Sequence, residues 1–165
     1  TLFRSSFSSI GSDFAHFMGG GGGVVVNNFF FGGYGMGLTT PLDYKGTENA
    51  SDPDSAYNLE FGHGGFWVGY VIAPRKPIHF SLSAQLGWGA LTSQLDYGYA
   101  PVSSENVFVL TPIAELEMNF SHFFKVGLGT SVSYVRGPGI SYTPYTVSDF
   151  IKPSVYLTFK FGWFN

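Results

Sequence analysis

The sequence predicts an all-β protein, an eight-stranded antiparallel up-and-down transmembrane β-barrel whose lumen is filled by side chains. Residues 151–164 alternate between an apolar parity, which ends in Phe161 and Trp163, and a polar parity that carries two lysines. This period of two indicates a strand. Only 12% of the residues are charged, against about 25% in average soluble domains. No run reaches the ~18 apolar residues of a transmembrane helix, and a closed barrel is the other structure that satisfies every backbone polar group in lipid.

The size and charge of the chain restrict its organisation and its partners. Its 165 residues suffice for one domain, residues 1–165. The net charge of −3 gives no general attraction to nucleic acid. The chain has no cysteine and opens directly into a strand-like pattern at Thr1. Because a membrane barrel must be exported, we expect that this chain is processed or truncated.

The connections between the predicted strands alternate in length. The predicted strands are residues 1–10, 14–26, 29–39, 58–73, 78–92, 106–120, 124–136 and 151–164. The connections are residues 11–13, 27–28, 40–57, 74–77, 93–105, 121–123 and 137–149. Apart from the first, every odd-numbered connection is long and every even one is short, which is typical of outer-membrane barrels with short periplasmic turns and long outer loops. Asn27 and Asn28 suit a tight turn because Asn tolerates positive φ.

The first three predicted strands are the least regular. Residues 1–10 alternate weakly, with Phe3 and Phe7 opposite Arg4. Residues 14–26 contain five consecutive glycines, which in barrels mark bends or close backbone approach; no Lys-Ser/Thr or helix follows to make a phosphate loop. We also expect these glycines to offer a smooth outer face to a partner protein. Residues 29–39 carry large side chains on one parity and glycines on the other, with the large set being Phe30, Tyr34, Met36 and Leu38.

The four strands that follow alternate clearly, and their apolar parity is predicted to face lipid. The residues on that parity are Phe66, Val68, Tyr70, Ile72, Ile78, Phe80, Leu82, Ala84, Leu86, Trp88, Ala90, Phe108, Leu110, Ala114, Leu116, Met118, Phe120, Phe124, Val126, Leu128, Val132 and Tyr134. In the last strand the same parity carries Val155, Leu157 and Phe159. The predicted lipid-facing and interface aromatics are Phe80, Trp88, Phe159, Phe161, Trp163 and Phe164.

All 8 Lys and Arg residues and all 11 Asp and Glu residues can be placed away from lipid, where a Lys or Arg costs about 2–4 kcal/mol at the midplane. The charged residues well within strands all fall on the polar parity, and they are Arg4, Glu115, Glu117, Lys125, Lys152 and Lys160. Glu60 and Arg136 lie at strand ends beside the predicted outer loops. Because unpaired buried charges are costly, we predict a lumen charge network of Arg4, Glu115, Glu117, Lys152 and Lys160. The alternative is that interior waters solvate these charges separately.

Two segments carry a resemblance to a known family. The run GGGGGVVVNNFFFGGYGMGL resembles the glycine-rich hairpin of small outer-membrane barrels of Gram-negative bacteria, those of Bacteroidota in particular. The terminal LTFKFGWF resembles the aromatic-ending strand that the barrel-assembly machinery recognises, although Asn165 follows the last Phe and an earlier glycine of that signal is absent. The resemblance implies an outer-membrane location, and the even number of predicted strands places both termini on the periplasmic side.

The histidines do not predict a metal or cofactor site, because no two of the four share metal-ligand spacing on one strand and there is no cysteine. We therefore expect no cofactor and no catalytic residue. His79 is expected to pack at the periplasmic interface. Eight-stranded outer-membrane enzymes that modify lipid acyl chains use a His with a Ser and an acid, and His63 with Glu60 and Ser55 is the corresponding alternative here.

The predicted loop at residues 40–57 is acidic. Its spacing is not that of an EF-hand, so a solvated loop is expected, with Ca²⁺ or bridged lipopolysaccharide as alternatives. Within it, Asp54-Ser55-Ala56 resembles an O-glycosylation acceptor of Bacteroidota, which makes Ser55 a candidate glycosylation site.

These patterns predict a non-catalytic structural or accessory subunit of a larger outer-membrane complex. The expected partners are membrane lipid and lipopolysaccharide, the barrel-assembly machinery and other outer-membrane proteins, with no nucleic acid. Recognition is assigned to the long loops through Tyr97, Tyr99, Tyr142 and Tyr145, since exposed tyrosines suit contact surfaces. The alternatives are a lipid A acyl-modifying enzyme, a soluble lipocalin-like carrier, which is also eight-stranded, and a narrow pore.

Overall fold

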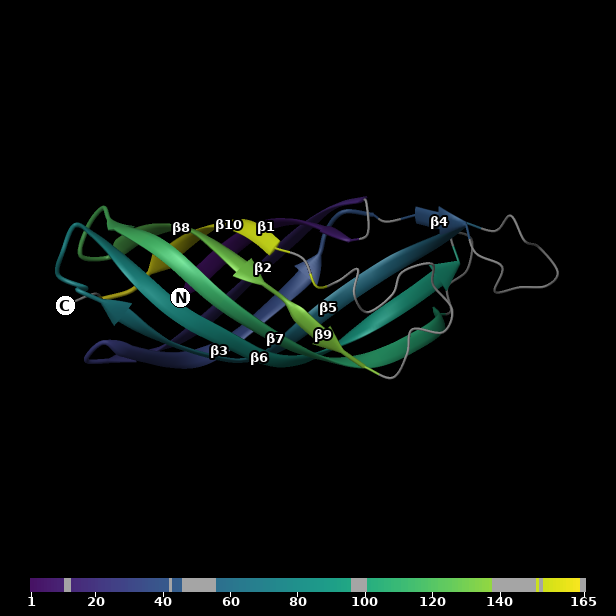
Figure 1. The fold of residues 1–165 in the computed structure, drawn as a ribbon, viewed down its shortest axis with the longest axis horizontal. Coiled ribbons are helices and arrows are strands. Elements are labelled where there is room, and N and C mark those ends of the chain that lie inside the picture. The colour runs from purple at the N-terminus through teal and green to yellow at the C-terminus, as the bar shows by residue number, and fades with distance from the viewer. Residues whose placement is uncertain are drawn as a thin grey trace.

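A computed structural model describes residues 1–10, 13–41, 43–45, 56–95, 101–137, 151 and 153–163, which form a closed antiparallel β-barrel (Figure 1). Its strands are β1 (Leu2–Ile10), β2 (Asp13–Val26), β3 (Phe29–Leu38), β4 (Asp43–Lys45), β5 (Ala56–Ile72), β6 (Ile78–Leu95), β7 (Pro101–Asn119), β8 (Phe124–Val132), β9 (Tyr134–Arg136) and β10 (Pro153–Phe161). Among the described residues, no helix has the length and apolarity to cross a membrane.

Eight strands make the wall of the barrel, as the sequence predicts. The order around the wall is β3-β2-β1-β10-β8-β7-β6-β5, and pairing of β3 with β5 closes it. The two remaining elements are additions: β4 pairs only with the start of β5, and β9 continues β8 after a break at Ser133 and pairs with β7. Closure leaves the wall without a free edge, which is the condition for placing a sheet in lipid.

The turns between β2 and β3, between β5 and β6, and between β7 and β8 lie at one end of the barrel, which we call the short-turn end. Asn27 opens the turn between β2 and β3 with a φ of 56°, the left-handed conformation that Asn tolerates. The termini of the wall meet at this end, where the Thr1 carbonyl accepts a hydrogen bond of 2.7 Å from the Phe161 N–H. We call the opposite end the long-loop end. β4 and the ends of β6 and β7 project from it (Figure 1).

The predicted loop boundaries at the long-loop end are wrong. The loop predicted at residues 93–105 is mostly strand, since β6 continues to Leu95 and β7 begins at Pro101. The loop predicted at residues 40–57 contains β4, which pairs with the first residues of β5. The polar residues of this end resemble loop sequence, but strands whose outer face meets water also accommodate them.

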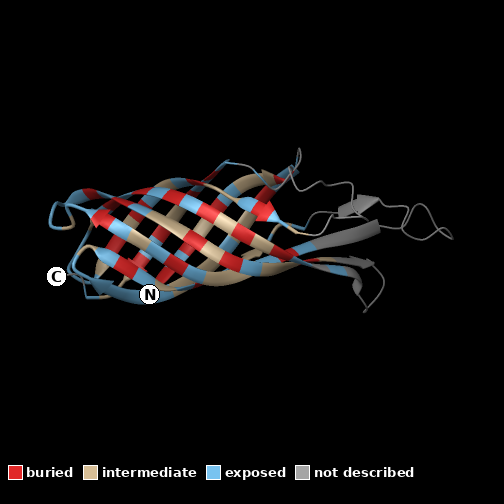
Figure 2. Cartoon of the chain, turned by 60° about the horizontal axis from the view of Figure 1, so that its bottom comes forward, coloured by how far each residue is buried: buried red, intermediate tan, exposed pale blue. Residues whose placement is uncertain are grey.

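Burial alternates along the strands as the two parities predict (Figure 2). On β10 the buried side chains are Ser154, Tyr156, Thr158 and Lys160, whereas Val155 and Phe159 are exposed. Large apolar side chains cover the outside of β6, β7, β8 and β10 in the same way, and we call this surface the apolar belt. It includes Ile78, Phe80, Leu82, Trp88, Leu116, Met118, Leu128 and Val155.

In β3 the large apolar parity faces the interior, opposite to its orientation in the other strands. Phe30 and Tyr34 are buried, while Gly33 and Gly35 of the other parity lie on the outside. Phe30 and Tyr34 belong to an interior cluster with Leu2, Trp67, Val71 and the partly buried Met36. When large residues and glycines alternate along a strand, the pattern distinguishes two faces but does not show which face points outward. In β3 the large side chains point inward, where they fill the interior.

Candidate functional site

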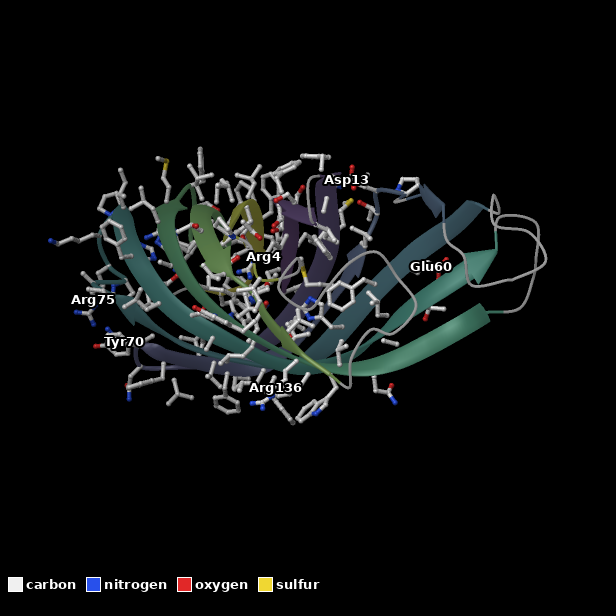
Figure 3. The ribbon with its side chains drawn as sticks, turned by 45° about the vertical axis from the view of Figure 1, so that its right-hand side comes forward. Arg4, Asp13, Glu60, Tyr70, Arg75 and Arg136 are labelled. Carbon is white, nitrogen blue, oxygen red and sulfur yellow. The ribbon has the colours of Figure 1, made fainter. Side chains whose placement is uncertain are left out.

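A cluster of buried charges crosses the interior between β1, β7 and β10. Lys160 Nζ lies 2.7 Å from Glu117 Oε1 and 3.1 Å from Glu115 Oε1, and Arg4 Nη2 lies 3.5 Å from Glu115 Oε2. Figure 3 shows Arg4 in the interior, with Arg75 and Arg136 at the periphery. Four of the five residues proposed for the network therefore lie together. Lys152, the fifth, lies outside the described residues.

Two further side chains join the charge network, and the pattern along single strands does not assign them to it. His79 Nε2 lies 3.2 Å from Glu117 Oε2, and its Nδ1 lies 3.1 Å from the Lys76 carbonyl. The Tyr156 hydroxyl donates to Glu115 Oε2 at 3.4 Å, beneath the Arg4 guanidinium, whose Cζ lies 4.2 Å from the ring centroid. The register between strands is the signal that identifies His79 as a member of the network, because His79 stands directly opposite Glu117 in the β6–β7 pair. His79 is thus buried in the lumen and does not pack at an outer interface.

Inward glycines make room for these long side chains. A Cβ on Gly127 would collide with the Glu115 side chain, and a Cβ on Gly129 would collide with the Tyr156 hydroxyl and the Ala114 carbonyl. Both glycines lie on β8, between the strands that carry Glu115 and Tyr156. Glycine in a strand often marks such close approach, so the glycines of β8 are part of the construction of the charge network.

A cavity of about 1150 Å³ lies at the short-turn end of the lumen. Its lining includes Lys125, Lys160 and Glu117 on one side, and Trp67 and Phe30 on the other. Trp67 joins the two sides, since its ring centroid lies 4.4 Å from that of Phe30 and 5.6 Å from Lys160 Nζ.

The long-loop half of the lumen is apolar. We call this cluster the apolar plug, and it comprises Ile10, Ala15, Phe61, Leu91, Val107, Val109 and Val135, with Phe17 and Leu38 packed against it. Val109 is fully buried and Leu91 is 4% exposed. The plug closes the interior above the charges, so the structure is a filled barrel at this level.

A polar cluster that the sequence did not predict lies on the outer wall of β1 to β3. Ser5 Oγ lies 2.8 Å from His16 Nε2, and His16 Nδ1 lies 2.7 Å from Thr39 Oγ1. The Thr39 hydroxyl donates to the His16 carbonyl at 3.0 Å, so it accepts from Nδ1–H, and Nε2 is left to accept the Ser5 proton. The His16 ring stacks on the exposed Phe7 with centroids 4.9 Å apart.

His63 and Glu60, two of the three residues of the alternative acyl-modifying site, lie on opposite faces of β5. His63 points into the barrel, where its Nδ1 lies 3.1 Å from the Tyr34 hydroxyl and its ring stacks on Phe61 at 5.3 Å. Glu60 is exposed on the other parity of β5, and Ser55 lies outside the described residues. Tyr97, Tyr99, Tyr142, Tyr145 and Phe164 lie outside them as well. Across the part of the chain that the structure describes, no three His, Asp or Glu side chains are grouped to hold a metal ion.

Of the comparisons with known proteins, the structural one bears on the fold. No family model matches the chain, and no curated protein matches it in sequence. Among solved structures it is similar to Neisserial surface protein A (NspA), with a TM-score of 0.61 and 13% identity over 97% of this chain and 94% of that chain. At this identity the likeness shows the fold alone, and the chain is an eight-stranded closed antiparallel β-barrel of the kind found in that surface protein.

Proposed function

We propose that the protein is an integral outer-membrane barrel with a structural or accessory role. The observation that supports this most is the apolar belt. Each charged side chain that the structure describes lies inside the barrel, in a turn or at the long-loop ends of the strands. Exposed Phe80, Leu82 and Leu128, at 53–58% exposure, are expensive in water and favourable in lipid.

The membrane location is tested by extraction and gel migration. We expect the protein to require detergent for release from membranes and to migrate differently on gels before and after heating, because a closed barrel resists unfolding by detergent at room temperature. Full release in buffer without detergent would favour the soluble lipocalin-like carrier. A carrier also requires an apolar interior, whereas the lumen here carries Arg4, Glu115, Glu117 and Lys160.

The accessory role is supported by a flat outer surface, which we call the glycine face: Gly22, Gly33, Gly35, Gly37 and Gly62. A Cβ on Gly22, Gly35 or Gly37 would meet no atom within 4 Å, and the nearest contacts at Gly33 and Gly62 are 3.6 and 3.8 Å. These glycines pair across β2, β3 and β5. Small residues let protein backbones approach closely in membranes, so we assign this face to packing against another outer-membrane protein.

Co-purification tests the glycine face. We expect Gly35→Phe to remove proteins that co-purify with the wild-type barrel from native membranes, because the ring holds the partner backbone away. Ala84→Phe, on the outer face of β6, is the matched control and keeps them. Equal recovery of every partner with both variants would contradict this assignment.

The Ser5–His16–Thr39 cluster favours a second candidate function, hydrolysis of acyl esters at the outer wall. In this reaction Ser5 Oγ bonds to the acyl carbon while its proton passes to His16 Nε2 and then to the leaving alkoxide. Water then cleaves the acyl-serine bond. The arrangement ranks second because the neighbouring N–H groups of His16 and Thr39 already donate, to Thr40 Oγ1 and the His16 carbonyl, and an oxyanion needs donors.

Ester hydrolysis is tested with the refolded barrel and p-nitrophenyl laurate in an uncharged detergent. If the second candidate is right, Ser5→Ala lowers the rate at least about 100-fold, as loss of a nucleophile does. Ser8→Ala leaves it unchanged. A wild-type rate equal to that of Ser5→Ala removes the second candidate.

A further inference from the structure

We propose that the short-turn mouth of the lumen is a binding site for an amphipathic anion. Its phosphate or carboxylate group lies between Lys125 and Lys160, and its apolar part lies against Trp67 and Phe30. The site comprises the cavity of about 1150 Å³ at this end. This inference concerns the interior of the barrel, and it holds whether or not the outer wall carries a partner.

The first support is the arrangement of charge. Lys125 and Lys160 stand directly opposite each other in the β8–β10 pair and are 6% and 7% exposed. Like charges opposite each other in a sheet are destabilising. The buried Arg4, Lys125 and Lys160 outnumber the buried carboxylates, Glu115 and Glu117, among the described residues. An anionic group between the two lysines removes the repulsion and balances the excess positive charge.

The second support is a buried donor in the cavity wall. Trp67 is 6% exposed and lines the cavity, and its indole Nε1 has no hydrogen-bond partner among the described residues. Leaving a buried donor unsatisfied costs about 1–3 kcal/mol. A phosphate or carboxylate oxygen in the cavity is an acceptor of the kind that this N–H requires.

The third support is the shape and lining of the cavity. The wall opposite the lysines, on β3 and β5, is apolar and includes Phe30 and Val71 beside Trp67, and Leu2 of β1 continues this apolar surface next to Lys160. The mouth adds the exposed Arg75 and His122 from two short turns. Because the apolar plug fills the long-loop half, a ligand enters from the short-turn end, with its anionic group toward the lysines. A ligand with both an anionic and an apolar part satisfies both walls, and inorganic phosphate satisfies only one.

The indole ¹⁵N–¹H resonance of Trp67 tests the proposal in the refolded barrel in an uncharged detergent. The chain has three tryptophans, and Trp67→Phe assigns the signal. We expect phenyl phosphate to shift this resonance saturably and to bind at least about tenfold more tightly than inorganic phosphate, a difference of about 1.4 kcal/mol. Benzyltrimethylammonium, with the same ring and the opposite charge, leaves the resonance unmoved.

Paired lysine variants identify the anion contact. We expect Lys125→Met to weaken phenyl phosphate binding at least about tenfold, since charge-assisted hydrogen bonds are the strong ones. Lys76→Met, an exposed lysine outside the cavity lining, leaves it unchanged. An unmoved Trp67 resonance, equal affinity for phenyl phosphate and inorganic phosphate, or equal loss in both lysine variants overturns the proposal. The wild-type titration needs no variant, so the test stands even if Lys125→Met does not fold.

Discussion

The two halves of the barrel have opposite distributions of polar and apolar side chains between the interior and the outer wall. Near the short turns the interior is charged and the outer wall is apolar, as with buried Glu115 behind exposed Leu82 and Leu116. Toward the long loops the interior is the apolar plug, and the outer wall of β5 to β7 carries Glu60, Thr92, Ser104 and Asn106. Along β5 to β7 the chain thus follows the rule for a membrane barrel in one half and the rule for a soluble β-protein in the other. On β1 and β2 the outer surface beside the plug stays aromatic, with Phe7 and Phe14 exposed.

The outer face of β7 changes in one step, from Phe108 to Asn106. The inward face changes more gradually, from Glu115 through Ile113 and Thr111 to Val109. Trp88 packs edge-on against Phe108 at this level, with ring centroids 5.7 Å apart. Aromatic residues flank the apolar band of membrane barrels, so we place the boundary between lipid and water at this pair. The medium outside each half explains which parity carries the apolar residues.

The largest expected effect is in the charged half. Glu117→Gln removes the carboxylate that holds Lys160 at 2.7 Å and His79 at 3.2 Å. Because it leaves Arg4, Lys125 and Lys160 with Glu115 as the one buried carboxylate among the described residues, we expect the free energy of unfolding to fall by about 3–5 kcal/mol. Urea unfolding in lipid vesicles measures it.

Glu60→Gln, at the exposed end of β5, is the control for Glu117→Gln and changes the free energy of unfolding by no more than about 0.5 kcal/mol. A loss at Glu117 no larger than at Glu60 would show that the buried charges do not act as a network.

The next largest effect compares the outer walls of the two halves on one strand. Leu82→Lys places a charge in the apolar belt of β6, and we expect it to lower the free energy of unfolding in vesicles by about 2–4 kcal/mol. Thr92→Lys, on the same parity of β6 beyond Trp88, costs about 0–1 kcal/mol. Equal costs at the two positions would place the boundary elsewhere.

The difference between the halves also explains what the sequence predicts and what it does not. Alternation predicts the strands and the short turns correctly, because in the belt the polar and apolar parities differ sharply. It does not reveal the plug, since Val107, Val109 and Val135 are inward apolar residues where the belt pattern calls for polar ones. The ends of β6 and β7 beyond the belt resemble loops in sequence, because there too the residues do not follow the alternation of the belt.

Parts of the candidate site also depend on information that one strand does not carry. Arg4, Glu115, Glu117 and Lys160 were identified because a charge within a strand must turn away from lipid. Their partners His79 and Tyr156 required the register between strands, which fixes His79 opposite Glu117. The cavity and the orphan Trp67 donor depend on packing across the lumen, which no local pattern encodes.

The smallest effect compares an inward glycine with an outward one. Gly127→Ala pushes a methyl group into the Glu115 side chain, and overpacking of this kind costs about 1–3 kcal/mol. Gly35→Ala meets no atom within 4 Å on the outer face and should be neutral or slightly stabilising, since Ala restricts the unfolded chain. Chemical unfolding of both variants in vesicles measures the difference, and a larger loss at Gly35 would reverse the assignment of the two faces.

The most direct test of the reversal is cysteine labelling of the barrel in lipid vesicles. The chain has no cysteine, so Leu82→Cys and Asn106→Cys each carry a single thiol on the outer wall, one in each half. With a membrane-impermeant maleimide, we expect rapid labelling at position 106. We expect the thiol at position 82 to be protected until the protein is unfolded in denaturant. Equal labelling of the two thiols in intact vesicles would contradict the account.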